Sequence, residues 1–184
     1  DERFVRDLAA RLGIPCTVRR VNVPELARRA KDGNANVESM GREVRYRAAT
    51  ALANGLSCQA DTPRAAARIL TAHTADDRAE TFLMNVIRGT GAAGLSSIPR
   101  RRNRVVRPLL DSTHEELCGI LRLRGIAWRE DATNEDTRHL RSYVRHEILP
   151  LLRGRNPAVV SALSTTSDIL SEEDAYLTHV AAQA

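Results

Sequence analysis

The sequence predicts an α/β protein, with a doubly wound, mostly parallel sheet followed by a small, mainly helical domain. Two short apolar stretches, residues 17–23 and residues 69–72, have the length and composition of strands. An amphipathic stretch of helical spacing lies beside each, residues 4–12 before the first and residues 76–88 after the second. Helices and strands that alternate along a chain are typical of a parallel sheet with helices on its faces.

Further helices are expected along the rest of the chain. Apolar spacing and helix-start signals predict them at residues 24–31, 36–56 and 113–123, and from Pro157 to about Val180. The first domain is expected to end at Pro108, after a run of arginines. This divides the chain into a domain of residues 1–108 and a domain of residues 109–184.

The positive charge of the chain is concentrated in one segment. The net charge is +5, and residues 99–155 hold 13 arginines against 8 acidic residues, so the whole excess lies there. A local excess of this kind attracts phosphate groups, which makes RNA the expected partner. The candidate phosphate contacts form one run, Arg100, Arg101, Arg102, Arg104 and Arg107. The other interpretation is a charged face that is only solvated.

The composition also bears on location and on metals. No apolar run approaches the length that a membrane span needs. The three cysteines, Cys16, Cys58 and Cys118, are isolated and lack the spacing of metal ligands. We therefore expect reduced thiols, a cytoplasmic location and no protein-bound metal site.

Acidic side chains gather where the helix at residues 76–88 begins, directly after a predicted strand. Asp77 and Glu80 are three residues apart, so their carboxylates project from one side of the first turn, and Asp76 lies beside them. In open α/β sheets, ligands bind at the carboxyl ends of the strands. The pair could hold an ammonium group or a metal ion. Alternatively, the acids only complement the helix dipole.

Arginines recur on two other predicted helices. Arg42 and Arg45 are three residues apart and could present two guanidinium groups to one phosphate-bearing ligand. Arg138, Arg141 and Arg145 form a second stripe. The side of that helix opposite the stripe is expected to face the core through Leu140, Val144, Ile148 and Leu149.

Three segments together resemble one known family. H-T-A-D-D-R-A-E-T at residues 73–81, followed by R-G-T-G-A-A-G-L at residues 88–95, is similar to the signature of the tRNA(Ile)-lysidine synthetases. These enzymes belong to the PP-loop ATP pyrophosphatase superfamily. E-S-M-G-R-E-V-R-Y at residues 38–46 and the block that begins at Trp128 and runs to Pro150 resemble the same family. In that block, Ser142 stands where the family usually has asparagine.

The resemblance implies a fold, a reaction and partners. The fold would be of the PP-loop, adenine nucleotide alpha hydrolase-like type. The family joins L-lysine to C2 of the wobble cytidine of tRNA(Ile) with a CAU anticodon. ATP, with Mg²⁺, first adenylates the C2 oxygen, and the lysine amine then displaces AMP. A homodimer is one of the assemblies that the sequence leaves open.

The resemblance also implies roles for individual residues. The expected catalytic residues are Arg42, Arg45 and Asp76, the expected ATP-binding residues are His73, Gly89 and Gly91, and the expected lysine-binding residues are Asp77, Glu80, Arg141 and Arg145. The arginine run from Arg100 to Arg107 would contact the tRNA.

One family feature is absent from the sequence. The relatives open with a strand and an S-G-G-x-D-S loop that binds the ATP pyrophosphate, and no such loop occurs in these 184 residues. We therefore expect a fragment that is inactive alone. Two rival functions stay open, a PP-loop tRNA thiolase and a non-enzymatic RNA-binding domain. Thiolases need paired cysteines, and a binding module would not need the acidic cluster.

Overall fold

The computed structural model describes residues 2–29, 37–129 and 139–183. The chain forms two compact units, residues 1–69 and residues 70–184. These units reflect packing within this chain, and the expected domains of residues 1–108 and 109–184 stay a prediction. No helix among the described residues is long and apolar enough to cross a bilayer.

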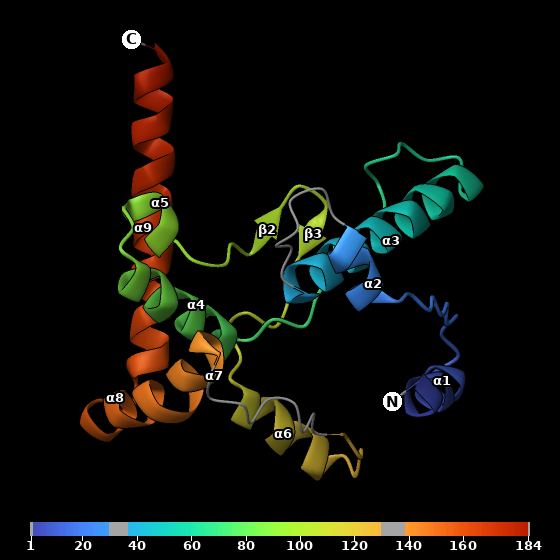
Figure 1. Ribbon diagram of the computed structural model, residues 1–184, viewed down its shortest axis with the longest axis horizontal. Helices are drawn as coiled ribbons and strands as arrows, with labels where there is room; N and C mark the ends of the chain where they lie inside the picture. Colours follow the sequence, from blue (N-terminus) through green and yellow to red (C-terminus); the bar gives the residue numbers. More distant parts are fainter. Residues whose placement is uncertain (1, 30–36, 130–138, 184) are drawn as a thin grey trace. The chain divides into compact units, whose positions relative to one another are not determined.

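The first unit is helical (Figure 1). It contains α1 (Glu2–Arg11), α2 (Val23–Arg29) and α3 (Val37–Gln59), with α2 packed against α3. These helices confirm the ones predicted from apolar spacing. The strand predicted at residues 17–23 is wrong, because residues 14–22 have no regular secondary structure. A strand exists only when a neighbour completes its hydrogen bonds, and no strand among the described residues pairs with this stretch.

A small three-stranded sheet begins where the second unit begins. Its strands are β1 (Ile69–Leu70), β2 (Arg101–Arg102) and β3 (Val105–Val106), in the order β1-β3-β2. β2 and β3 form an antiparallel hairpin, in which Arg101 lies opposite Val106. The turn between them holds Asn103 at φ 55°, a conformation that asparagine tolerates well. The α/β class is thus confirmed, whereas the doubly wound sheet is not seen among the described residues.

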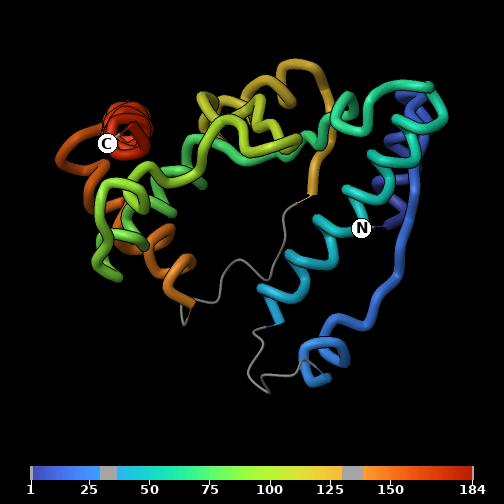
Figure 2. The backbone as a smooth tube through the Cα atoms, turned by 90° about the horizontal axis from the view of Figure 1, so that it is seen from above, coloured from blue at the N-terminus to red at the C-terminus, as the bar shows by residue number. Residues whose placement is uncertain are grey.

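Helices make up the rest of the second unit. They are α4 (Ala75–Arg88), α5 (Ala92–Leu95), α6 (His114–Leu123), α7 (Leu140–Tyr143), the π-helical turn η2 (Val144–Ile148), α8 (Leu149–Arg155) and α9 (Val159–Gln183). Helices α4 and α5 pack against α9 (Figure 1), and Figure 2 shows α9 nearly end-on. The starts of α4 and α6 are held by capping boxes, Thr74 with Asp77 and Thr113 with Glu116.

The apolar core of this unit joins α4 to the helices that follow residue 139. Its buried members are Ala75, Ala79, Val144, Leu149, Val159 and Val160, and Leu140 and Ile148 pack against them. The core face predicted for residues 140–149 is therefore confirmed. This core holds the first turn of α4 against the helix that carries Arg141 and Arg145.

The π-helical turn has a local cause. Pro150 has no backbone N–H and its ring crowds the carbonyl one turn earlier, so the regular ladder cannot continue there. Leu149 instead donates its N–H to the Val144 carbonyl oxygen. The turn absorbs one extra residue. In a regular helix, the eight steps of about 100° from Arg145 to Arg153 would leave the two side chains roughly 80° apart around the axis. The extra residue in the π-helical turn offsets this difference, so the two arginines lie on nearly the same side of the helix.

The core can be tested by truncating one side chain. Leu149 is 2% exposed, so Leu149→Ala should lower the free energy of unfolding by about 2–5 kcal/mol, because it removes buried methyl groups and leaves a cavity. Leu151→Ala is the matched control, since Leu151 is 73% exposed and should change it by less than about 0.5 kcal/mol. Urea denaturation measures both, and equal losses would contradict the packing described.

Candidate functional site

The candidate site forms at the first turn of α4 (Figure 1), which residues 71–74 separate from β1. Between strand and helix, His73 Nδ1 lies 2.9 Å from Thr71 Oγ1. Thr74 then caps the helix, and its backbone N–H donates to Asp77 Oδ2 at 2.8 Å. One oxygen of Asp77 is thus used by the cap, and Oδ1 points elsewhere.

Two arginines from the helix after residue 139 close over the acids. Arg141 bridges both carboxylates, since its Nη2 donates to Asp77 Oδ1 and its Nε to Glu80 Oε2, each at 2.8 Å. Arg145 donates to both oxygens of Glu80, from Nε at 2.6 Å and from Nη2 at 3.0 Å. The structure therefore brings together all four residues predicted to bind lysine, although their role stays a prediction.

The two acids differ in their surroundings. Glu80 is 1% exposed and both of its oxygens accept from guanidinium groups, so it anchors the cluster. The Asp77 side chain is 23% exposed. Hydrogen bonding to Glu80 raises the pKa of Arg145. Two acids and two arginines leave the cluster neutral. A ligand that carries both an ammonium and a carboxylate could therefore exchange partners with it, and Asp77 is the more accessible acid for that exchange.

Asp76 makes different contacts from its neighbours. Its Oδ1 pairs with Arg153 Nη2 at 2.5 Å, and its Oδ2 accepts the backbone N–H of His114 at 2.6 Å. That N–H lies at the start of α6, where a carboxylate is favoured. Asp76 thus joins α4 to α6 and α8 through these two contacts. This is a structural role, in addition to the catalytic role predicted for it. Sequence reasoning missed Arg153, because only the π-helical turn brings it into line with Arg145.

The glycines of the signature lie at the other end of α4. Gly89 ends the helix at φ 75°, and the helix is about 20 Å long at 1.5 Å per residue. The structure therefore does not bring Gly89 and Gly91 together with His73. Gly94 is the glycine that packing requires, because a Cβ there would lie 2.0 Å from Thr90 Oγ1. Asn85 Nδ2 also donates to the Gly94 carbonyl oxygen at 2.8 Å.

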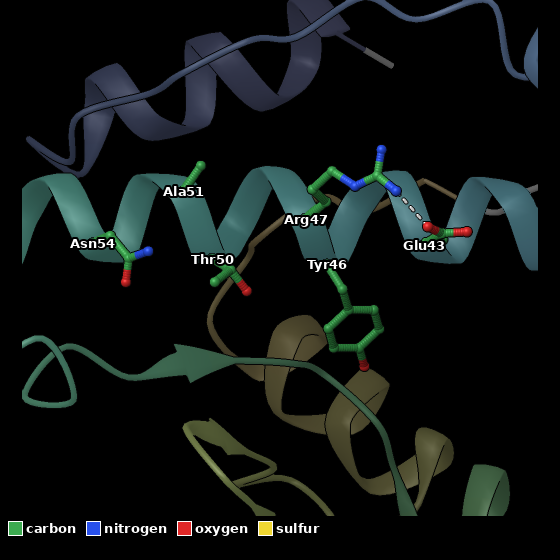
Figure 3. Close-up of a pocket in the computed structure, with 6 residues that line it drawn as sticks. All are labelled: Glu43, Tyr46, Arg47, Thr50, Ala51 and Asn54. Carbon is green, nitrogen blue, oxygen red and sulfur yellow. Dashed lines mark hydrogen bonds and ion pairs between the residues drawn. The ribbon is translucent and has the colours of Figure 1, made fainter.

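Arg42 and Arg45 lie on α3, in the first unit. The guanidinium of Arg42 stacks 5.0 Å from the centre of the Tyr46 ring, and Arg45 Nε donates to the Gly41 carbonyl oxygen at 3.3 Å. A cavity of about 470 Å³ lies against this helix (Figure 3), lined by Glu43, Tyr46, Arg47, Thr50, Ala51 and Asn54. Neither predicted catalytic arginine lines it.

The five arginines of the basic run divide into two groups. Arg101 and Arg102 on β2 are exposed, and Arg104 in the hairpin is partly exposed. Arg107 is buried and its Nη1 donates to the Pro99 carbonyl oxygen at 2.7 Å. Arg100 pairs with Asp111 and Asp168. Arg107 and Arg100 thus already have partners within the protein.

The remaining predictions concern cysteines and metals. Cys16 and Cys58 are exposed and Cys118 is buried, and all three are free thiols. Within the described ranges, no group of three or more His, Cys, Asp or Glu side chains could hold a metal ion. The predicted motif residues Glu130, Asp131, Thr133 and Asn134, and Arg138 of the predicted stripe, lie outside the described residues.

Comparison with known proteins defines the class. The PP-loop domain family matches residues 1–152. This chain belongs to that family.

Curated relatives narrow the likeness to particular enzymes. The chain is 44% identical over 177 residues to the tRNA(Ile)-lysidine synthase of Thermus thermophilus, which covers 96% of this chain and 32% of the relative. It is 40% identical to the synthase of Deinococcus radiodurans, over 100% of this chain and 29% of the relative. The synthase of Porphyromonas gingivalis is 38% identical, over 92% and 35%. The predicted resemblance is confirmed, and the chain spans about a third of the length of these relatives.

The stability of the cluster depends on Glu80, which suggests a first test. Glu80→Gln keeps the size of the side chain but removes the charge that two guanidinium groups share. Hydrogen bonds to charged groups contribute about 1.5–3 kcal/mol each, so the free energy of unfolding should fall by at least about 1.5 kcal/mol. Glu147→Gln, at an exposed position of η2, is the matched control and should change it by less than about 0.5 kcal/mol. Equal small effects would mean that the ion pairs contribute little.

Proposed function

We propose that this chain is the catalytic region of a ligase that joins L-lysine to C2 of the wobble cytidine of tRNA(Ile) with a CAU anticodon. The observation that carries the proposal is the cluster in which two carboxylates of α4, Asp77 and Glu80, pair with two arginines of the helix after residue 139. It could pair with both an ammonium and a carboxylate of an amino acid, and the curated relatives named above are tRNA(Ile)-lysidine synthases.

The proposed chemistry has two steps. The C2 oxygen of the cytidine attacks the α-phosphate of ATP and pyrophosphate leaves, so that the poor leaving group at C2 becomes AMP. The neutral ε-amine of lysine then forms the C–N bond at C2, AMP departs with the electrons of the broken C2–O bond, and the amine nitrogen releases a proton to water. Binding the three substrates in the right orientation supplies much of the rate enhancement, because the amine and C2 then react within one complex and not as separate molecules in solution.

Lysine would bind by exchanging ion pairs. Its α-carboxylate offers Arg141 or Arg145 a new partner, and the Asp77 Oδ1 that Arg141 now occupies would accept an ammonium group. Glu80 is too deeply buried for such an exchange and instead holds the two arginines in place. The proposal therefore assigns binding to Asp77 and positioning to Glu80.

ATP use follows from membership of the PP-loop family. His73, Gly89, Gly91, Arg42 and Arg45 stay the proposed nucleotide and catalytic residues, with Asp76, on the strength of the family resemblance. The carboxylates of the α4 turn do not fit Mg²⁺, because each is already paired with arginine. Mg²⁺ is therefore proposed only as a companion of the ATP phosphates.

The hairpin of β2 and β3 is the proposed contact with tRNA. Its exposed arginines lie in the segment that holds the excess positive charge. The doubly wound sheet, the cytoplasmic location and the homodimer belong to this proposal as expectations about the whole protein. Against the thiolase alternative, the three cysteines do not form a close pair in the sequence. A pure binding module is disfavoured, because the acids in the first turn of α4 form ion pairs with two arginines, and a charged helix end would not need such pairs.

The lysine site is tested by Asp77→Asn in the complete enzyme. Loss of an ion-paired acid from a desolvated site costs about 2–5 kcal/mol, so the lysine KM should rise at least 30-fold, while the ATP and tRNA KM values stay within about twofold. Glu116→Gln is the matched control, because Glu116 is the corresponding capping-box acid of α6. A rise of less than about threefold for Asp77→Asn would mean that Asp77 only caps the helix.

The tRNA contact is tested by reversing charge on the hairpin. Arg101→Glu together with Arg104→Glu should weaken tRNA binding and flatten the plot of log affinity against log salt by about 1.4–1.8, the value for two lost phosphate contacts. Arg3→Glu together with Arg11→Glu changes the net charge equally at exposed positions of α1. If both pairs of substitutions gave the same slope, only overall charge would matter and the hairpin would not be the contact.

A further inference from the structure

Asp168 of α9 joins two arginines that are far apart in the sequence. Its Oδ1 accepts from Arg78 Nη2 at 2.6 Å, and its Oδ2 accepts from Arg100 Nη2 at 3.0 Å. Arg78 belongs to α4, whereas Arg100 directly precedes β2. One carboxylate thus connects α4, α9 and the base of the hairpin of β2 and β3.

Arg78 depends strongly on this carboxylate. Its side chain is 1% exposed, and its Nε and Nη1 have no hydrogen-bond partner in the part of the chain that the structure describes. A buried guanidinium without a counterion is costly. Arg78 also lowers the pKa of Asp168, more than Arg100 does, so the carboxylate is charged at neutral pH.

Arg100 is held from several sides. It pairs with Asp111 as well as with Asp168, and its carbonyl oxygen accepts the Arg107 N–H at 3.0 Å. The preceding segment is tied to α4, because Ser97 Oγ donates to the Arg78 carbonyl oxygen at 2.8 Å. The base of the hairpin is therefore immobilised, while Arg101 and Arg102 remain exposed beyond it.

We propose that Asp168 is a positioning residue for RNA binding, which withholds Arg100 from RNA phosphates and leaves Arg101, Arg102 and Arg104 as the contacts. A phosphate would have to compete with two carboxylates for Arg100. Arg78, Arg100, Asp111 and Asp168 form a neutral group, so this part of the surface adds no net attraction for RNA. The inference rests on the proposed tRNA contact of the hairpin and replaces the prediction that Arg100 binds tRNA.

The consequence can be measured as a salt dependence. Asp168→Asn preserves the shape of the side chain but removes its charge, so Arg100 gains freedom to reach a phosphate. The slope of log affinity against log salt for a tRNA(Ile) transcript should become steeper by about 0.7–0.9, the value for one added phosphate contact. Adding Arg100→Gln to Asp168→Asn should return the slope to the wild-type value. Glu172→Gln makes the same charge change at an exposed position of α9 and should leave the slope unchanged.

The outcomes separate the two proposals. If Asp168→Asn lowers the Tm but leaves the slope unchanged, the carboxylate is only structural and the inference is wrong. If Asp168→Asn fails to fold, Arg100→Gln alone decides, because a shallower slope in that variant would show that Arg100 already contacts phosphate. If the wild-type chain shows no salt-dependent tRNA binding, the proposed function of the hairpin fails, and this inference fails with it.

Discussion

The ion pairs between Glu80 and the two arginines are the interaction on which the second unit depends. Glu80 is buried, so its charge must be compensated inside the protein. Arg141 and Arg145 supply that compensation from a helix more than sixty residues later. The apolar core beneath them, from Ala79 to Val144, holds the two helices at the distance that the ion pairs need. Packing and charge therefore specify the same arrangement.

This arrangement gives the two neighbouring acids different surroundings. A carboxylate that holds two guanidinium groups in a buried position is poorly suited to releasing either of them. Asp77 is more exposed, with its Oδ1 hydrogen-bonded to Arg141 and 3.9 Å from Arg145 Nη2, and is therefore better placed for exchange. A site that is neutral when empty also selects against simple cations, because any cation that enters must displace an arginine with nowhere else to pair. A ligand that carries both an ammonium and a carboxylate would avoid that cost, since its own carboxylate would replace the lost partner.

Local patterns predicted the helices that carry the acidic and arginine clusters better than they predicted the sheet. Thr74 and the spacing of Ala79 and Phe82 were enough to identify α4, and the spacing of Arg141 and Arg145 identified the opposing stripe. The strand at residues 17–23 was wrong because strand formation depends on a neighbour that local spacing cannot reveal. The pairing of Arg78 with Asp168 joins residues 90 positions apart. Only the folded core brings those two helices together.

The most direct test of the central claim follows the arginines themselves. In protein labelled with ¹⁵N-arginine, with ATP present, the Nε–Hε signals of Arg141 and Arg145 report on the partners of each guanidinium. Exchange of ion pairs predicts that lysine shifts the Arg141 signal in a saturable way, whereas cadaverine, which has the same chain and both ammonium groups without the α-carboxylate, shifts it far less. Signals that stay unchanged with lysine, or that respond equally to cadaverine, would contradict a lysine site built from this cluster.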